Sequence, residues 1–579
     1  MIRPITAIVL SALFSTVSGL ATAQDLASFH AGMGGCTVCH GTNTVTAANV
    51  PDDEIDLNNK CMACHGDYKK LADKTKHFDP HASHLSDRSP INCTACHAAH
   101  AKPKLVCNDC HTFDLKMPFS DAPESAKWDA TIDAEAVAAA EKSAPRETVD
   151  VLVIGAGSAG LNAAIAAKRA GARVILLEKH SFAGGNSMLA AGGYNAVGTP
   201  QQAKKGIKDT VDQYVKDTMK GGRGKNDPKL VQILAEGSAD GVKWLEDMGA
   251  DLSDVKRSGG AAVDRTHRPH GGMSVGPHIV DVLRAQATKE GVGARVNSRA
   301  VKLLLDKDYK IAAKAVVLAT GGYGQNKQMI AFYRPTFKDM TSSNNVTSTG
   351  DGITMALNIG ASMTDIDWVQ AHPTVGLDSR ILISETVRGV GAVMVNINGE
   401  RFVNELTTRD RASDAILHQP QKRAWLVFDS NLYKSAKMVQ GYDHLGMLKK
   451  ADTLAELAKI CDMDAKTLEK TASDYNKFRK AGKDEAFGRP DMPLGIEKAP
   501  FYAVAVAPGI HHTMGGVAIT PESEVLDIQS RPIPGLYAAG EVTGGVHGFN
   551  RLGGNAIADT VVFGRRSGEH AAAYALKAK

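Results

Sequence analysis

The sequence predicts a multidomain protein, in which a small, mostly irregular and helical domain precedes a larger α/β domain that an insertion interrupts. Eight of the nine cysteines cluster between Cys36 and Cys110. A glycine-rich β-α-β pattern begins at Val149, and a second strand with a glycine turn returns near residue 533. The chain also has 579 residues, more than the roughly 100–200 residues of one domain. We therefore expect at least two domains.

The composition is that of a globular protein with no strong charge. Hydrophobic residues make up 43% of the chain and charged residues 22%, which is ordinary for soluble domains. The formal net charge of +4 is small for this length. It gives no reason to expect a nucleic acid or an anionic membrane surface as a partner.

The N-terminus predicts a signal peptide over residues 1–23. Arg3 supplies a positive charge, an apolar stretch runs from Ile5 to Leu20, and Ala21-Thr-Ala23 fits the small-x-small cleavage pattern. The alternative is a membrane anchor, but the stretch is shorter than the roughly 20 residues that span a bilayer. We expect export, a mature chain that begins near Gln24, and no stable membrane insertion.

Four pentapeptides share the pattern Cys-x-x-Cys-His, at residues 36–40, 61–65, 93–97 and 107–111. The cysteines of this pattern form thioethers to haem c, and the histidine ligates the iron. Zinc sites, redox dithiols and four disulfides are the alternatives, but the histidine in all four repeats favours haem. The predicted attachment residues are Cys36, Cys39, Cys61, Cys64, Cys93, Cys96, Cys107 and Cys110, with His40, His65, His97 and His111 as iron ligands.

The remaining histidines predict bis-histidine ligation in a tetrahaem domain over residues 24–118. Four six-coordinate irons need four further ligands, and five histidines are available: His30, His77, His81, His84 and His100. Spacing alone makes His77 or His81 the spare one. Iron with both axial positions filled transfers electrons and binds no small gas. Residues 119–147, rich in Ala, Lys and Glu, then predict a linker with a helix over 133–142.

A dinucleotide-binding motif follows the linker. Val149–Ile154 predicts a buried strand, and Gly155-Ala-Gly157-Ser-Ala-Gly160 leads into an alanine-rich helix that ends near Gly171. A second strand over 173–177 ends at Glu178, 23 positions after the first glycine. In this Rossmann-like unit, the glycines admit a pyrophosphate to the helix N-terminus, and the acid binds a ribose.

The rest of the chain favours FAD over NAD. Glycine-rich backbone at 184–187 and 190–193 follows the second strand, and residues 533–541 form a late strand, a glycine turn and Glu541. The chain therefore leaves the nucleotide fold and returns to it. An NAD domain does not need such a return, whereas an extended FAD does.

Six motifs resemble the fumarate reductase and succinate dehydrogenase flavoprotein family. They lie at residues 184–187 (GGNS), 370–374 (QAHPT), 401–405 (RFVNE), 408–410 (TRD), 511–516 (HHTMGG) and 551–556 (RLGGNA). With the tetrahaem segment and signal peptide, the mature chain resembles the soluble periplasmic flavocytochrome c fumarate reductases of Shewanella type, especially the iron-induced branch. The resemblance implies an FAD domain over 148–255 and 363–579, and an α+β clamp domain over 256–362 that closes over substrate.

The resemblance also implies the roles of the active-site residues. Reduction of a C=C bond between carboxylates needs a hydride donor, cations that hold the carboxylates, and an acid. Arg409 is the implied proton donor, Glu385 and Arg388 its relay, and Arg551 the group that stabilises developing charge. Four of the key side chains, His372, Arg409, His511 and Arg551, are expected in loops between strands. The implied substrate contacts are Gly193, His372, Ser384, Glu385, His511, Arg551 and Gly554.

The cofactor contacts follow from the same resemblance. Residues 187–193 contain no histidine to which the flavin could be tethered, so we expect one dissociable FAD. The implied distal haem ligands are His30, His81, His84 and His100, with His77 spare. The implied FAD contacts are Gly155, Gly157, Ala159, Gly160, Glu178, Lys179, Asn186, Gly192, Gly193, Asp351, His512, Glu541, Asn555 and Ala556.

Three departures from the family pattern bear on function. Leu382 replaces a methionine of some relatives, and Phe549 is larger than the residue often found there. The stretch 301–316 lacks a hairpin, which should shorten a peripheral sheet. The expected function is the reduction of fumarate to succinate by a monomeric protein. The expected electron donor is a membrane-anchored quinol-oxidising cytochrome or another small cytochrome. The alternatives are another unsaturated acid, such as methacrylate or urocanate, and a non-enzymatic periplasmic electron carrier.

Overall fold

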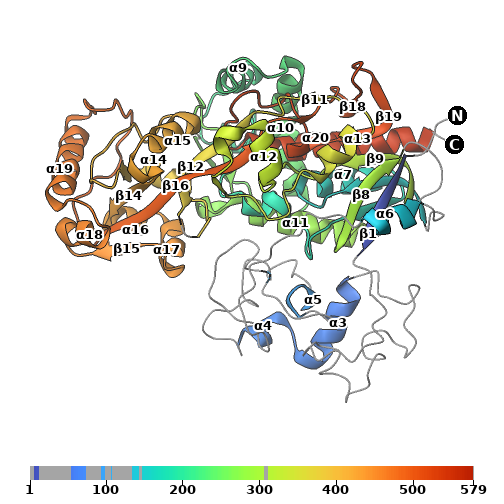
Figure 1. Cartoon of the computed structure of the whole chain (residues 1–579), viewed down its shortest axis with the longest axis horizontal. Coiled ribbons are helices and arrows are strands. Elements are labelled where there is room, and N and C mark those ends of the chain that lie inside the picture. Colours follow the sequence, from blue (N-terminus) through green and yellow to red (C-terminus); the bar gives the residue numbers. More distant parts are fainter. Residues whose placement is uncertain are drawn as a thin grey trace.

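The computed structural model describes residues 5–11, 54–73, 93–97, 106, 134–141, 147–257, 259–304, 311–377 and 379–577. Two bodies dominate these residues: a sheet with flanking helices on the right of Figure 1, and a second sheet with its own helices on the left. Helices α3 (Glu54–His65), α4 (Tyr68–Ala72) and α5 (Cys93–Cys96) lie below the first body. None of the helices in these residues is long and apolar enough to cross a membrane.

Two of the four Cys-x-x-Cys-His motifs lie in the described residues. Cys61 and Cys64 are one helical turn apart on α3, which ends at His65, and Cys93 and Cys96 are likewise spaced on α5. The Cys93 backbone N–H donates to Asn58 Oδ1 at 2.8 Å, which ties α5 to α3. The other two motifs and all predicted distal histidines lie outside the described residues. Helix α6 (Ala134–Glu141) confirms the helix predicted in the linker.

The first sheet contains the predicted nucleotide fold. Its strands β2 (Glu147–Ile154), β3 (Val174–Leu177), β7 (Ala294–Arg295), β9 (Ile311–Leu318) and β19 (Pro532–Ala538) are mutually parallel, in the order β19-β9-β2-β3-β7, with β18 (Glu524–Leu526) antiparallel at the β19 edge. The branched apolar side chains of β2 are buried, as a central parallel strand requires. The predicted β-α-β unit and the late return strand are both confirmed.

Two helices pack closely beside this sheet. Helix α7 (Ser158–Arg169) follows the glycine turn, and α20 (Asn555–Lys577) runs against it. A Cβ at Gly564 would lie 2.7 Å from the Ala159 carbonyl oxygen, and one at Gly568 would lie 2.2 Å from that of Ala163. The close approach of α20 to α7 therefore requires glycine at both positions. This contact holds the C-terminus on the nucleotide fold.

The second body has its own sheet and its own hydrophobic clusters. Strand β16 (Phe501–Thr513) pairs with β10 (Thr341–Ser342), β12 (Val369–Gly376), β14 (Ala424–Asp429) and β15 (Lys449–Ala451), and β13 (Val393–Val395) pairs with β14. The accompanying helices are α14 (Glu385–Val390), α15 (Arg409–Leu417), α16 (Ser430–Ser435), α17 (Lys437–His444), α18 (Leu454–Ile460) and α19 (Ala465–Ala481).

This topology corrects the predicted boundaries of the insertion. Residues 256–362 were expected to form the clamp, but β7 and β9 within that range belong to the nucleotide sheet. Helix α11 (Val275–Lys289) packs against α7. The separate sheet is built mainly from residues 369–513, which were assigned to the FAD domain. The reason is that β9 fills the position between β2 and β19, so the nucleotide sheet is incomplete without it.

Two smaller sheets and further helices accompany the two bodies. Strands β4 (Tyr194–Asn195), β6 (Thr266–Arg268) and β5 (Asp254–Lys256) form a three-stranded sheet, and β11 (Met363–Thr364) pairs with β17 (Gly516–Val517). The remaining helices are α8 (Pro200–Lys204), α9 (Val211–Gly221), α10 (Pro228–Asp247), α12 (Lys327–Tyr333) and α13 (Asp351–Asn358).

A strand from the predicted signal peptide joins the nucleotide sheet. Strand β1 (Ile5–Ser11) pairs antiparallel with β8 (Ser298–Leu304) and, over Ile5–Ala7, with β9. It thus lies at the position where the missing hairpin was expected to shorten the sheet. Pairing in this sheet and removal as a signal peptide are mutually exclusive fates for the same residues in the mature chain.

Candidate active site

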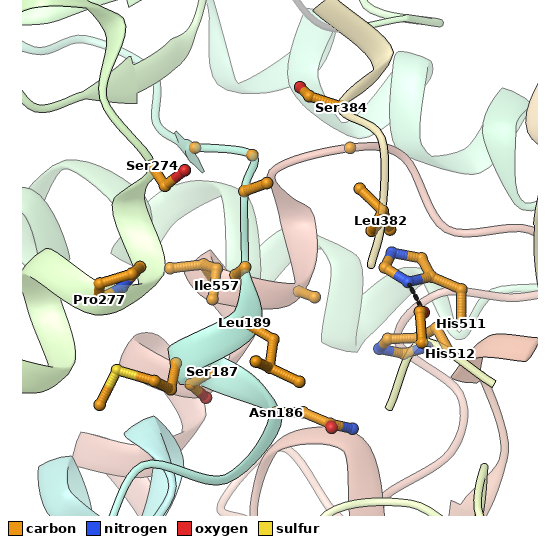
Figure 2. A pocket seen from close by; sticks show the side chains of 18 of the residues that line it. Asn186, Ser187, Leu189, Ser274, Pro277, Leu382, Ser384, His511, His512 and Ile557 are labelled. Carbon is orange, nitrogen blue, oxygen red and sulfur yellow. Dashed lines mark hydrogen bonds between the residues drawn. The ribbon is translucent and has the colours of Figure 1, made fainter. Parts of the chain in front are cut away.

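One cavity of about 2190 Å³ runs from the glycine turn of the nucleotide fold to the second body. Its walls come from both bodies: Asn186, Ser187 and Leu189 follow the second strand of the nucleotide fold, and Leu382, Ser384 and His511 belong to the second body (Figure 2). Helix α11 contributes Pro277 to the wall. A cavity of this length at the carboxyl ends of parallel strands suits a dinucleotide with a substrate site beyond it.

The glycine turn leaves its backbone open to the cavity. Gly155 adopts φ +101, and a Cβ there would lie 2.5 Å from the Ala319 carbonyl oxygen. At Gly160 a Cβ would lie 1.8 Å from the Gly155 carbonyl oxygen, so this glycine shapes the turn and does not itself line the cavity. Gly157 and Ala159 do line it. The residues therefore fit the pyrophosphate of a dinucleotide.

The acidic residue after β3 lies where the motif predicts it. Glu178 lines the cavity, and its carboxylate accepts the backbone N–H groups of Ala156 at 2.9 Å and His180 at 2.8 Å. These two hydrogen bonds fix the carboxylate between the glycine turn and the end of the strand. A carboxylate has about four acceptor sites, so Glu178 retains capacity for a ribose hydroxyl.

A charged cluster borders the same part of the cavity. The Asp351 carboxylate lies 3.1 Å from Lys179 Nζ and 2.9 Å from Arg299 Nε. Burial alone would raise the pKa of Asp351, but the two cations outweigh burial and lower it. Both predicted residues, Lys179 and Asp351, thus line the cavity as a pair.

The middle of the cavity holds polar groups from three segments. Asn186 Nδ2 donates to Glu541 Oε2 at 3.2 Å, and Glu541 Oε1 accepts the Thr513 N–H at 2.9 Å. His512 lies below His511 in Figure 2, and its buried Nδ1 has no hydrogen-bond partner among the described residues. A buried unpaired polar atom beside open glycine backbone indicates a missing polar ligand. These features fit FAD.

Besides Gly160, a second predicted FAD contact, Asn555, does not line the cavity. The Asn555 side chain donates to Thr218 Oγ1 at 3.1 Å and accepts from Asn195 Nδ2 at 2.7 Å. It therefore braces the start of α20 and does not line the cavity. Its neighbours Gly554 and Ala556 do, as do Gly192 and Gly193.

Two histidines, the buried His372 and the partly buried His511, face each other at the far end. His372 and His511 have ring centroids 5.1 Å apart. His372 Nδ1 accepts the Thr374 N–H at 3.2 Å, so a neutral ring carries its proton on Nε2, and that atom has no partner among the described residues. Ser343 Oγ lies 2.9 Å from His511 Nδ1. Burial lowers the pKa of both rings well below the usual value, which keeps both rings neutral at pH 7.

Two arginines share one acceptor beside these histidines. Arg409 Nη1 donates to Gln370 Oε1 at 3.2 Å, and Arg551 Nη2 donates to the same oxygen at 3.1 Å. The Arg551 Nε is buried without a partner among the described residues. Burial, with Arg409 nearby, lowers the pKa of Arg551 to about 9. Two guanidiniums with no carboxylate between them suit a bound dianion.

The predicted relay pair lies behind Arg409. Arg409 Nε donates to Glu385 Oε2 at 3.2 Å, and Arg388 Nη2 lies 3.9 Å from the same oxygen. Glu385 and Arg388 are on α14, spaced i and i+3 as predicted. Burial would raise the pKa of Glu385, but the guanidiniums of Arg409 and Arg388 outweigh burial and lower it. Arg388 is fully buried and does not line the cavity.

The structure also places the two departures from the family pattern. Leu382 lines the cavity next to His511 (Figure 2), so this substitution bears directly on the substrate space. Phe549 does not line the cavity. It packs against Trp368 at 5.8 Å, with the Arg223 guanidinium 4.2 Å from its ring. Ser384 lines the cavity and caps α14 through the Thr386 N–H.

The expected loop setting of the four key side chains is wrong for three of them. His372 lies in β12, His511 in β16, and Arg409 is the first residue of α15, whereas Arg551 is outside regular structure. Sequence reasoning gave no role to Gln370, although it lies in a quoted motif. Its proximity to His372 in the sequence was the available indication.

Fold and site together define a flavin-dependent oxidoreductase with covalently attached haem. Comparison with known families agrees. The family described as "FAD binding domain" matches residues 150–557, and "Cytochrome c3" matches residues 29–112. The cofactors are FAD and haem c, and four haems fit this type of protein.

Similar proteins place the chain more closely. It is 61% identical to "Probable fumarate reductase Ifc3" of Shewanella frigidimarina, with 97% of each chain covered. It is 44% identical to a "Fumarate reductase (cytochrome)" of Shewanella frigidimarina, over 96% of this chain and 100% of that protein. A solved open conformation of a flavocytochrome c3 fumarate reductase is 62% identical, with a TM-score of 0.84 over 95% of this chain and 100% of that chain. The chain belongs to the flavocytochrome c fumarate reductase family.

Proposed function

We propose that this protein reduces fumarate to succinate, with electrons passing through the haems to FAD. The observation that carries the proposal is the set of groups at the far end of the cavity: two neutral histidines beside two guanidiniums that share only a neutral amide oxygen. Such a set binds a dicarboxylate and has a proton donor within the same shell. The named relatives support the same reaction.

The residues divide the work of the reaction. Bound reduced FAD supplies a hydride to one carbon of the C=C bond. His372 Nε2, His511 and Arg551 hold the carboxylates, and Ser384 and the backbone at Gly193 and Gly554 complete the pocket. Arg409 donates a proton to the other carbon. Glu385 then returns a proton to Arg409, and Arg388 returns one to Glu385. The product thus gains one hydride and one proton, and water supplies the proton.

A second candidate is reduction of another unsaturated acid, because Leu382 lies beside His511 where it contacts the substrate space. Methacrylate has one carboxylate, and urocanate carries an imidazole in place of the second. Both would leave one of the cationic groups without an anionic partner, which costs binding free energy. A non-enzymatic electron carrier would not need arginines buried around a substrate cavity, and burying their charges costs free energy.

One assay separates these functions. The holoprotein is reduced with a viologen, and reoxidation is followed with fumarate, methacrylate and urocanate. We expect kcat/KM for fumarate to exceed that for each of the other two acids by at least about 100-fold, since an unpaired buried charge costs several kcal/mol. Faster reaction with either of the other acids would reassign the substrate, and no reaction with any would leave electron transfer as the function.

Several further features belong to the proposal. The second body moves as the clamp that closes the cavity, FAD is held without a covalent bond, and the haem irons are bis-histidine ligated. The protein acts as a monomer in the periplasm, and a membrane-anchored quinol-oxidising cytochrome or a small cytochrome delivers the electrons.

Export predicts the start of the mature chain. We expect intact mass and N-terminal sequencing of the purified periplasmic protein to show a chain that begins near Gln24, because Ala21-Thr-Ala23 precedes it. A mature chain that still contains Ile5–Ser11, the residues of β1, would contradict this. The cytoplasmic precursor is the control, since it retains residues 1–23 together with the mature chain.

A further inference from the structure

The motif over residues 401–405 contains a buried acid to which the reaction above gives no role. Glu405 has no exposed surface. Its carboxylate accepts Arg401 Nε at 2.8 Å and Nη2 at 2.9 Å, Arg489 Nη1 at 3.1 Å, and the Met394 N–H at 3.1 Å. Four N–H groups on one fully buried carboxylate fix its position.

The same residue holds the end of the predicted relay. Arg388 Nη1 donates to the Glu405 carbonyl oxygen, and Arg489 Nη2 donates to the Arg388 carbonyl oxygen, each at 2.5 Å. Glu405 therefore holds the Arg388 guanidinium, and Arg489 holds the Arg388 backbone. The other two nitrogens of that guanidinium, Nε and Nη2, have no hydrogen-bond partner among the described residues. Of these two nitrogens, Nη2 lies 3.9 Å from Glu385 Oε2.

The charges around Arg388 make Glu405 its second anion. The groups that face it are Glu385, Arg409, Glu405 and Arg489, together with the neutral His372. Burial lowers the pKa of the Arg388 guanidinium, Arg409 and Arg489 add to this, and Glu385 and Glu405 oppose it. Without the Glu405 carboxylate, Arg388 and Arg409 would share the single carboxylate of Glu385. The positive charge of Arg489 would then lose the carboxylate with which it is paired.

We propose that Glu405 is a positioning residue of the proton relay, which holds Arg388 against Glu385 and favours its reprotonation after each turnover. The inference rests on the proposed function. In each cycle Arg388 gives one proton to Glu385 and regains one from water, with no change in oxidation state. The negative charge of Glu405 stabilises the protonated guanidinium and so draws the relay back to its starting state.

The experiment compares Glu405→Gln with Asp484→Asn in the holoprotein. Asp484 lies 2.9 Å from Arg401 Nη2 and makes no contact with the Arg388 side chain, so it is a matched control. We measure kcat and KM for fumarate against pH with reduced viologen, and FAD and haem content by absorbance. For Glu405→Gln we expect kcat to fall by roughly 10- to 100-fold, KM to stay within about 2-fold because Glu405 does not line the cavity, and the alkaline limb of kcat to move to lower pH.

The sign of that shift follows from the charge. Loss of the carboxylate disfavours protonated Arg388, so the relay loses its proton at a lower pH. Asp484→Asn should leave the pH profile in place. An unmoved profile in Glu405→Gln would overturn the proposal, as would an equal shift in Asp484→Asn, since that would mark a merely structural effect.

A third variant keeps the test decisive if Glu405→Gln does not fold. Glu405→Asp retains the charge but shortens the side chain by one methylene, so kcat should fall while the alkaline limb stays at the wild-type pH. A moved limb in Glu405→Asp would overturn the proposal. Failure of the proposed function is distinguishable, because the wild-type protein would then show no fumarate reduction at all.

Discussion

Replacing Arg409 with alanine should reduce the kcat for fumarate by roughly 1,000-fold, while FAD and haem stay bound. Arg409 is the first residue of α15, its Nε donates to Glu385 at 3.2 Å, and its Nη1 donates to Gln370 at 3.2 Å. The variant removes the proton donor, and loss of a positioned acid costs roughly 100- to 10,000-fold. The measurement is viologen-driven turnover, with flavin and haem quantified by absorbance.

The control lies two residues further along the same helix. Arg411 is exposed and does not line the cavity, so Arg411→Ala should retain wild-type kcat. Arg409→Lys retains a cation but not the two-pronged geometry that reaches both Glu385 and Gln370, so we expect it to remain strongly impaired. Activity near wild type in Arg409→Ala would remove Arg409 from the mechanism.

The local parts of the fold could be predicted from the sequence. The turn from Gly155 to Gly160 and the acid at Glu178 lie within one β-α-β unit, so spacing alone determines which groups meet. The structure has Gly155 at φ +101 and the Gly160 Cα packed against the Gly155 carbonyl, as this motif requires. The helix over 134–141 and the return strand β19 were also predictable from local pattern.

The boundary of the second body could not be predicted in the same way. Strand β9 belongs to the nucleotide sheet because it pairs with β2, more than 150 residues earlier, and with β19, more than 200 later. A buried apolar strand carries no mark of which sheet it joins.

In the candidate site, too, the residues could be predicted from the sequence, but the way in which the fold brings them together could not. The motifs identified His372, Arg409, His511 and Arg551, but the pairing of β12 with β16 is what brings the two histidines together. His372 lies opposite Gly509, and Gln370 lies opposite His512, with irregular register between Gln370 and Ala371. Gln370 accepts hydrogen bonds from both arginines at this point of the sheet, and no local pattern predicts that contact.

The second large effect is expected at Arg551. Replacing it with glutamine should lower kcat/KM for fumarate by roughly 100- to 1,000-fold, the cost of losing one preorganised charge at the reacting group. Arg551 is buried, its Nη2 donates to Gln370 at 3.1 Å, and its Nε has no partner among the described residues, so a substrate carboxylate would satisfy it. FAD content and kcat/KM of the holoprotein are the two measurements.

The pH profile gives Arg551 a separate test. Burial, with Arg409 nearby, lowers the pKa of Arg551 to about 9. The protonated form binds the dianion, so kcat/KM of the wild-type protein should fall as pH rises through about 9, and this limb should be absent in Arg551→Gln. Because kcat/KM reports the free enzyme and kcat the bound complex, this limb is distinct from the one assigned to Arg388. Arg531→Gln, which removes an exposed arginine paired with Asp527, should keep the limb in place. A wild-type limb that survives in Arg551→Gln would contradict this assignment to Arg551.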